Sequence, residues 1–524
     1  MTRKLRIMLG HQVETEKFSF GRIFALQIVL FFIIYGIMLM PRFSTDSYSV
    51  YFYTSDALSG LLELGRTGTY LLFKILLAFC INSVTLSPVF TAIFILTVSW
   101  SAAVILSMLK PCFSRPSRLT VLLLELAVAL AFANIYFAEL YFFSDVALMY
   151  TFAVLFLTLA LILFFHCKNR IIGTISAMLC LYISLSFYQA FLGFFMIFGS
   201  MIVLVRHDAL GMRRKAQLDK SFVWDLLRLI VVGAGGSVAN VLVMSILATV
   251  GFSSSRGPSL SMTGIVNSVQ QAIEQFHYYY PTGYPNYLTG LMKVIFILSG
   301  PALLCLLVGS FIKDRQKKQY PYLSMFITLM VLFSGVLFVF APHFAAKSVW
   351  MPPRSICSFF AVFTVMAVLT GYNCSQNGKP VSFAAPIVVL LLLTVNIIGI
   401  QGIALDQMAV NRQDRAEAEQ IVRYIQKYEE ESGFSVDTIS WSSDGRYTWT
   451  HPEIKYSFMD MNVRAGARSW SLIDCISYYA GHRFNTEPMP DEIWAANFLG
   501  QEWDSFRADE QIRFEGNKMY LMVY

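Results

Sequence analysis

The stretch 23–40, IFALQIVLFFIIYGIMLM, is strongly apolar and carries no charged residue. A helix of roughly 17 to 25 such residues crosses the hydrocarbon core of a bilayer, so this stretch predicts a membrane span. Comparable runs recur along the chain as far as residue 402. Together they predict eleven spans: 23–40, 89–109, 119–137, 146–166, 171–187, 189–205, 229–250, 291–312, 322–341, 355–372 and 383–402.

The composition agrees with these spans. Of the 524 residues, 56% are hydrophobic and only 14% are charged, and the mean hydropathy is +0.58. Soluble domains have about a quarter charged residues, so the chain is an integral membrane protein. The same numbers argue against a disordered chain and against a soluble protein that binds nucleic acid. Eight cysteines without a C-x-x-C pair support neither a disulfide scaffold nor a redox centre.

The charges are distributed unevenly. Residues 1–405 carry 28 Lys and Arg against 13 Asp and Glu, whereas residues 406–524 carry 12 against 20. Counted loop by loop, 21 basic residues fall on the side of the amino terminus and six on the other side. Because basic loops stay in the cytoplasm, we predict a cytoplasmic amino terminus and an acidic tail outside.

The count depends on the short apolar run 69–82, which includes Lys74. A lysine at the bilayer centre costs about 2.5 to 3.5 kcal/mol, and a crossing here would abolish the charge asymmetry. We therefore predict an interfacial helix at 69–82. The predicted fold class is an all-α polytopic membrane protein with about eleven transmembrane helices and this interfacial helix.

The chain divides into a transmembrane domain, 1–402, and a C-terminal domain, 403–524. The second begins with a charged stretch in which apolar residues recur at helical spacing until Gly433. Residues 434–441 and 512–524 are typical of strands, the latter with a turn at its glycine and asparagine. The tail therefore predicts a small extracytoplasmic α+β domain, and it contains no recognisable catalytic motif.

In this topology, six of the 13 acidic residues outside the tail lie at the outer surface: Asp46, Asp56, Glu63, Glu139, Asp145 and Glu274. Asp46 follows the first span, and Glu139 and Asp145 flank an aromatic stretch between the third and fourth spans. Three carboxylates can thus face one cavity. The alternative for Glu139 and Asp145 is that water simply solvates them.

Two arginines share that surface. Arg66 lies near the interfacial helix and Arg354 opens the tenth span. A guanidinium group binds phosphate through two parallel hydrogen bonds, so both are candidates for an anionic, lipid-linked ligand. Contact with ordinary lipid headgroups is the alternative.

Other polar groups are candidates for binding a sugar. Tyr188 and Gln189 interrupt the apolar run 171–205, although a tight helical hairpin explains the break equally well. His277 lies in the long outer loop 251–290, which can close over a substrate or anchor at the interface, and His343 lies in the last outer loop. No H-E-x-x-H motif is present. We therefore predict no metal and no cofactor, without excluding a divalent cation.

The order of these features resembles that of the GtrII-like family of bacterial O-antigen and cell-surface glucosyltransferases, which are of the GT-C type. The matching stretches are Ser44-Thr45-Asp46-Ser47-Tyr48, Leu64-Gly65-Arg66, Ala138-Glu139-Leu140 through Asp145, Ser186-Phe187-Tyr188-Gln189-Ala190 and Pro353-Arg354. The family often has two adjacent acids after the first span. Thr45 replaces the first of them here, which leaves Asp46 and weakens the case for a metal.

The resemblance implies an inverting hexosyltransferase of the bacterial plasma (inner) membrane. It would move a sugar, expected to be glucose, from polyprenyl phosphate (undecaprenyl phosphate) to a cell-surface glycan such as the O-antigen of lipopolysaccharide. Asp46 would be the catalytic base, with Arg66 and Arg354 on the donor phosphate. Glu139, Asp145, Tyr188, Gln189, His277 and His343 would bind the substrates. Implied partners are membrane lipids, a flippase and a polyprenyl-phosphate glucosyltransferase.

Other classes of protein stay open. A polymerase or ligase of lipid-linked glycans needs the same base and the same phosphate partner. A transporter needs ionisable groups deep in several spans, and only Glu125 and Lys293 qualify. A scaffold protein that uses its acidic tail for binding is the third alternative.

Overall fold

The computed structural model describes residues 19–54, 58–113, 116–207, 220–252, 261–277, 288, 290–312, 321–344, 346, 348–376, 381–443, 449–454 and 460–524. Within these residues, nine helices are long and apolar enough to cross a membrane. They are α2 (Phe20–Tyr35), α6 (Ser87–Leu109), α9 (Ala147–His166), α10 (Arg170–Phe187), α12 (Lys220–Thr249), α14 (Leu291–Ile312), α15 (Pro321–Phe344), α16 (Phe359–Gln376) and α17 (Ala384–Ser432). Short 3-10 turns extend four of them: η2 (Gly36–Leu39), η3 (Lys110–Cys112), η4 (Ser144–Val146) and η8 (Pro353–Ile356).

The remaining two predicted spans are helical but atypical. The run 119–137 forms a bent pair, α7 (Arg118–Phe132) and α8 (Ile135–Phe142), whose axes differ by 47°. Counted as one span, this pair gives ten in the described residues. The run 189–205 forms α11 (Phe191–Arg206), which is apolar but only 16 residues long.

Asn134 causes the break between α7 and α8. Its side chain accepts a hydrogen bond of 2.9 Å from the backbone N–H of Phe137, which caps α8. The Oδ1 atom of Asn396 on α17 accepts another, of 3.0 Å, from the N–H of Ile135. Two of the orphan donors at the start of α8 are thus satisfied although they are buried, so α8 can begin here in a new direction.

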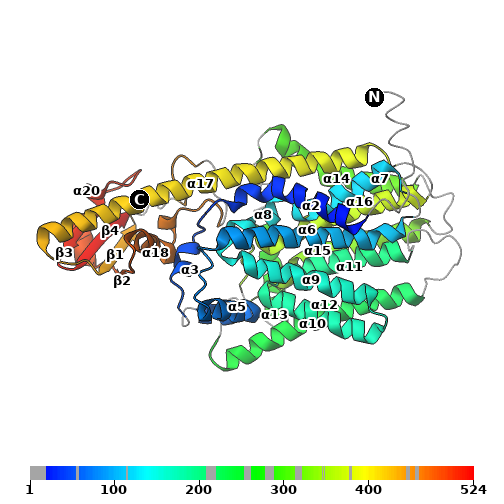
Figure 1. Cartoon of the computed structure of the whole chain (residues 1–524), viewed down its shortest axis with the longest axis horizontal. Helices are drawn as coiled ribbons and strands as arrows, with labels where there is room; N and C mark the ends of the chain where they lie inside the picture. The colour runs from blue at the N-terminus through cyan, green and yellow to red at the C-terminus, as the bar shows by residue number, and fades with distance from the viewer. Residues whose placement is uncertain are drawn as a thin grey trace.

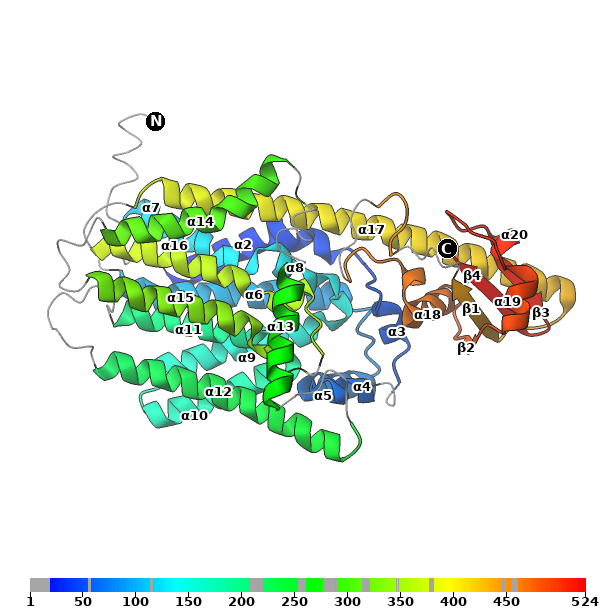
Figure 2. The ribbon, with the colours of Figure 1, turned by 180° about the vertical axis from the view of Figure 1, so that it is seen from behind.

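Short helices lie at one end of the bundle. They are α3 (Ser47–Tyr51), α4 (Ser59–Glu63) and α5 (Thr67–Ala78), the helix predicted to be interfacial. With 12 residues α5 is too short to cross a bilayer, and Leu71 and Ile75 on it are exposed. A further helix, α13 (Met262–His277), lies across the bundle (Figure 2). It falls in the predicted outer loop 251–290, where no helix was predicted.

One helix joins the two parts of the chain. The 49-residue α17 runs along the whole length of the molecule, with the small sheet beside its far end (Figure 1). The domain boundary predicted at residue 402 lies inside this helix. Gly433 ends it in the left-handed conformation, with φ +74°, as its position in the sequence predicts.

The C-terminal part holds a four-stranded sheet of order β2-β1-β4-β3. Its elements are β1 (Thr438–Ser443), β2 (Asn485–Pro488), β3 (Ile512–Glu515), β4 (Lys518–Val523) and the helices α18 (Ser469–Ala480), α19 (Asp491–Asn497) and α20 (Ala508–Gln511). As predicted, the last two strands form an antiparallel hairpin. Ile421 and Ile425 of α17 pack into the same core as Ile439 and Leu521 of the sheet. The helix that leaves the bundle is therefore also part of this domain.

The domain also rests directly on the bundle. Tyr48 of α3 is only 1% exposed and packs with Ala418 of α17 and Cys475 of α18. Phe43 stacks on the Tyr48 ring, with 4.8 Å between the centroids. These contacts hold the segment 40–51 between the end of the membrane part and the C-terminal domain.

Candidate functional site

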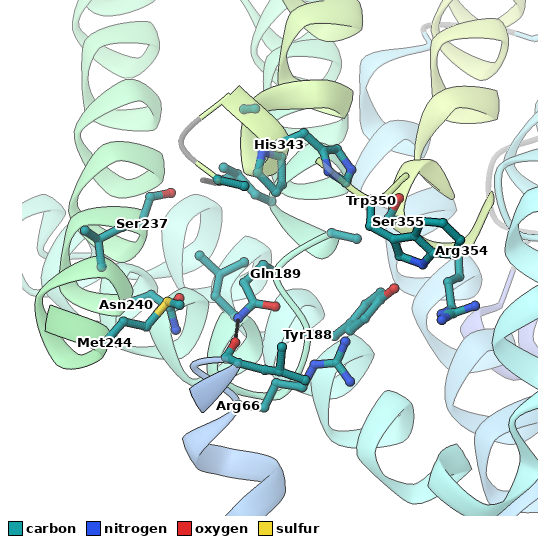
Figure 3. Close-up of a pocket in the computed structure, with 18 of the residues that line it drawn as sticks. Arg66, Tyr188, Gln189, Ser237, Asn240, Met244, His343, Trp350, Arg354 and Ser355 are labelled. Atoms are coloured by element: carbon teal, nitrogen blue, oxygen red, sulfur yellow. Dashed lines mark hydrogen bonds between the residues drawn. The ribbon is translucent and has the colours of Figure 1, made fainter. Parts of the chain in front are cut away.

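A cavity of about 250 Å³ lies at the end of the bundle that carries α3 and the C-terminal domain. Five of the predicted site residues line it: Arg66, Tyr188, Gln189, His343 and Arg354. The other lining residues are all uncharged: Leu64, Leu185, Ala190, Leu192, Ser237, Asn240, Val241, Met244, Ala341, Pro342, Ala346, Ser348, Trp350, Pro352 and Ser355. Figure 3 shows the Tyr188 ring between the side chains of Arg66 and Arg354.

Gly65 brings Arg66 to this cavity. Its backbone has φ +70°, which only glycine adopts without strain, and an added Cβ atom would collide with the Met244 side chain. The turn after α4 can therefore approach α12 closely. The guanidinium carbon of Arg66 lies 5.2 Å from the centroid of the Tyr188 ring, in a cation–π contact. Gln189 supports the same turn, because its amide donates a hydrogen bond of 3.2 Å to the carbonyl of Leu64.

The two arginines differ in their partners. Among the described residues, no carboxylate lies within 4 Å of the Arg66 guanidinium. Arg354, in contrast, makes ion pairs of 2.7 Å with Glu139 and 2.9 Å with Asp460. Its guanidinium carbon also lies 4.3 Å from the centroid of the Phe143 ring. Glu139 is fully buried and also accepts a hydrogen bond from the backbone N–H of Arg354, so α8 and η8 are locked together.

The C-terminal domain completes this network. Asp460, the second partner of Arg354, also accepts a hydrogen bond of 3.0 Å from Arg468. The Arg468 guanidinium lies over Trp449 and Trp470, at 4.2 and 5.3 Å from the ring centroids. Sequence reasoning missed these residues because it placed no site residue in the tail. The sequence signal around these residues was their aromatic and basic composition, with Trp449, Arg464, Arg468 and Trp470 close together in the chain.

Asp46 lies at the start of α3 and faces both parts of the chain. Its Oδ1 atom accepts a hydrogen bond of 3.0 Å from the indole N–H of Trp470. Burial raises the pKa of the Asp46 carboxyl above its usual range, while the nearby charge of Arg354, and more weakly that of Arg66, lowers this pKa. The aspartate predicted to be the base thus lies within electrostatic reach of both predicted phosphate-binding arginines.

Asp145 supports this arrangement without lining the cavity. Its buried Oδ1 atom accepts hydrogen bonds of 2.7 Å from Ser47 and 3.3 Å from Ser44, the residues that flank Asp46. Asp145 is therefore placed to hold the turn that presents Asp46. His343 lines the cavity and is buried, whereas His277 is exposed at the end of α13 and lines neither that cavity nor the one beside Asp46. The structure does not bring His277 to the site.

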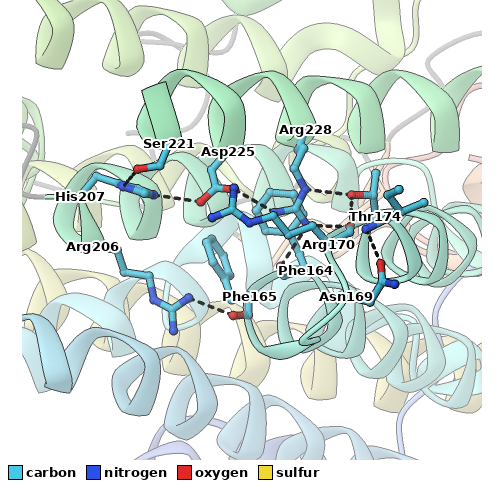
Figure 4. Close-up of polar contacts among 11 residues, drawn as sticks. Phe164, Phe165, Asn169, Arg170, Thr174, Arg206, His207, Ser221, Asp225 and Arg228 are labelled. Atoms are coloured by element: carbon cyan, nitrogen blue, oxygen red, sulfur yellow. Dashed lines mark hydrogen bonds and ion pairs between the residues drawn. The ribbon is translucent and has the colours of Figure 1, made fainter. Parts of the chain in front are cut away.

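A second polar cluster lies at the other end of the bundle, where α10 begins (Figure 4). Asp225 accepts hydrogen bonds of 2.8 Å from Arg228 and 2.9 Å from His207. Arg206 donates one of 3.0 Å to the carbonyl of Phe165. These contacts tie the ends of α9 and α11 to α12. They also place basic residues at the end opposite to the cavity, the distribution that the charge count predicts.

No metal site is evident in the described part of the chain. Within it, no group of three or more His, Cys, Asp or Glu residues is placed to hold an ion. The acids near the cavity instead face arginine, tryptophan and serine donors. That the protein works without a metal stays a prediction.

Comparison with known proteins gives one result. A family model described as Glucosyl transferase GtrII matches residues 35–371, which is more than half of the chain. No curated protein and no solved structure matches. The matched range includes all nine predicted site residues and none of the residues that the C-terminal domain adds.

Proposed function

The chain belongs to the GtrII glucosyltransferase family, and from this premise we propose that it moves glucose from a polyprenyl-phosphate carrier to a surface glycan. We further propose that transfer takes place at the outer face of the bacterial plasma membrane. One observation supports the proposal most. The Asp46 carboxylate accepts a hydrogen bond from Trp470, and the Trp470 ring lies under Arg468. Arg468 shares Asp460 with Arg354, which lines the largely apolar cavity together with Arg66.

The cavity has the chemistry that a lipid-linked donor requires. Met244 and Val241 of α12 line it, whereas Val238 and Leu242 of the same helix are 55% and 57% exposed. The exposed apolar side of α12 is suited to lipid, so a prenyl chain can stay in the membrane beside it. Arg66, without a carboxylate partner among the described residues, is the natural ligand for the phosphate.

The transfer step follows from this placement. The oxygen of an acceptor hydroxyl attacks the anomeric carbon of the donor sugar and forms the new glycosidic bond. The bond between that carbon and the phosphate oxygen breaks, and its electron pair leaves with the polyprenyl phosphate. The proton of the hydroxyl passes to the Asp46 carboxylate, and such general-base help accelerates reactions by about 100- to 10,000-fold.

The arginines would act on the leaving phosphate. Negative charge grows on the phosphate as the anomeric bond breaks, so a fixed cation stabilises the transition state more than the ground state. Arg66 is the direct candidate. Arg354 would add a second positive charge. Its ion pairs with Glu139 and Asp460 fix the position of the guanidinium group. A single displacement of this kind inverts the anomeric configuration.

The test is glucose transfer in membranes that contain the full chain. Wild type, Asp46→Asn and Glu274→Gln are supplied with polyprenyl-phosphate glucose carrying a radiolabel and with the surface glycan. Glu274 is a matched control, because it is an exposed acid that lines neither cavity. We expect Asp46→Asn to lose at least about 100-fold in rate and Glu274→Gln to retain wild-type activity. Full activity of Asp46→Asn would overturn the proposed base.

A further inference from the structure

A second cavity, of about 430 Å³, lies between α3 and the C-terminal domain. It is lined by Asp46, Ser49, Tyr53, Ser469, Trp470, Ile473, Asp474, Arg483, Phe484 and Thr486. It shares no lining residue with the first cavity. Asp46 therefore borders the second cavity, while the arginines of the first cavity act on its charge.

We propose that this second cavity binds the acceptor, a hydroxyl-rich carbohydrate chain, an inference that rests on the proposed function. Sugar transfer needs two substrates on opposite sides of the reacting bond. The apolar first cavity with its two guanidinium groups suits the lipid-linked donor. A base that takes the acceptor proton has to face the acceptor, and the second cavity is the one that Asp46 lines.

The chemistry of the lining matches a carbohydrate. Trp470 is 49% exposed, so its indole presents an apolar surface to the ring of a sugar while its N–H remains bonded to Asp46. Ser469 and Thr486 supply hydroxyl groups that both donate and accept hydrogen bonds. The Ser49 hydroxyl donates to the carbonyl of Trp470 and can still accept a hydrogen bond. Such a mixture of aromatic and uncharged polar groups fixes a ligand that is itself neutral and rich in hydroxyls.

An ion pair at the wall of the cavity can orient a bound sugar. The Nε atom of Arg483 lies 3.4 Å from Asp474, and the Arg483 side chain is 56% exposed. The guanidinium has further donors beyond this pair, and the Asp474 carboxylate has further acceptor sites. Neighbouring hydroxyls of one sugar can therefore donate to Asp474 and accept from Arg483.

The range of the family match supports separate roles for the two parts of the chain. It ends at residue 371, so it includes Asp46, Arg66 and Arg354 but not Trp470, Asp474 or Arg483. The shared part of the chain then carries the donor chemistry. The C-terminal domain, outside the match, selects the acceptor.

The test uses the full chain and three variants. Thr486→Trp fills the cavity, and Arg483→Ala removes an exposed donor from its wall. Ser505→Trp is the matched control, because Ser505 is exposed in the same domain and does not line the cavity. The probe is an oligosaccharide released by mild acid from the surface glycan of the source organism. We measure its KM, the KM of the donor, and direct binding of the probe by calorimetry.

We expect the acceptor KM to rise at least about tenfold in Thr486→Trp and in Arg483→Ala, with the donor KM unchanged and Ser505→Trp like wild type. Wild-type acceptor KM in both cavity variants, together with an inactive Asp46→Asn, would overturn the acceptor site and leave the proposed function standing. If wild type transfers no glucose, the proposed function is wrong. Binding of the probe, measured by calorimetry, then tests the carbohydrate site by itself. Binding that Thr486→Trp abolishes supports a carbohydrate site, and equal binding in all variants overturns it.

Discussion

The Oδ1 atom of Asp46 lies 3.0 Å from the indole nitrogen of Trp470, although 424 residues separate them in the chain. The acid comes from the first loop after α2, and its hydrogen-bond donor comes from the C-terminal domain. The same domain supplies Asp460 to Arg354. The candidate site is thus shared by the two parts of the protein, and each part influences the charges of the other.

Trp470→Phe should change the pH dependence of transfer. The hydrogen bond from Trp470 lowers the pKa of Asp46, which burial has already raised, so its loss raises that pKa further. A base acts in its deprotonated form, which is lost as the pH falls through its pKa. The acidic limb of the donor kcat/KM, measured at saturating acceptor, should therefore move to higher pH. Trp449→Phe, which also lies at Arg468, is the control, and an unmoved limb in Trp470→Phe would contradict a base at Asp46.

Arg66→Ala and Arg354→Ala should separate catalysis from stability. Removing Arg354 leaves the buried Glu139 without its partner, which costs about 3 to 5 kcal/mol, so the melting temperature in detergent should fall clearly. Arg66 has no such partner among the described residues. Its removal should leave the melting temperature near that of wild type while transfer falls by about 100- to 1,000-fold. Equal losses of stability in the two variants would contradict the distinct roles.

Gly65→Ala should impair the site through the backbone. The left-handed conformation at φ +70° costs a residue with a Cβ atom about 1 to 2 kcal/mol, and that atom would also collide with Met244. We expect a higher donor KM, because the turn that carries Arg66 has to move. Gly60→Ala in the neighbouring α4 is the control, since nothing lies within 4 Å of its added Cβ atom. Donor kinetics that are the same for both variants would contradict this account.

Gln275→Ala should loosen one wall of the donor cavity. On α13, Gln275 donates a hydrogen bond of 2.6 Å to the carbonyl of Val349 and accepts one of 2.9 Å from the N–H of Met351. Leaving these backbone groups unpaired costs about 1 to 3 kcal/mol. The donor KM should rise, as measured by initial rates. Gln270→Ala, on the exposed side of α13, should behave like wild type, and a similar effect of both substitutions would exclude a specific role for Gln275.

Much of the fold could be predicted from the sequence because a bilayer imposes strict requirements. Each crossing needs a long apolar run, and each such run in the described residues is helical. The terminal hairpin was equally predictable from its alternating pattern and its glycine–asparagine turn. Neither signal extends to irregular segments. Hydropathy did not reveal α13, whose mixture of polar and apolar residues suits a helix that lies across the bundle.

The candidate site was predictable only in part. Asp46, Arg66 and Arg354 could be identified because charged residues are uncommon next to apolar membrane segments. Glu139 and Asp145 lie close by, but face Arg354 and the Ser47 hydroxyl rather than the cavity. His277 was predicted to bind substrate, but it lines neither cavity. A position in an outer loop says which surface a residue reaches, and not where on that surface it lies.

The amino-acid sequence by itself determined the membrane class, most of the long apolar helices, the acidic tail and the resemblance to glucosyltransferases, because hydropathy, charge and short motifs act locally along the chain. Only the tertiary structure decided that Trp470 bonds to Asp46 and that Asp460 pairs with Arg354. The physical reason is α17, which leaves the bundle as one continuous helix and carries the C-terminal domain with it. No local pattern encodes contacts between segments that lie far apart in the sequence and meet only through packing.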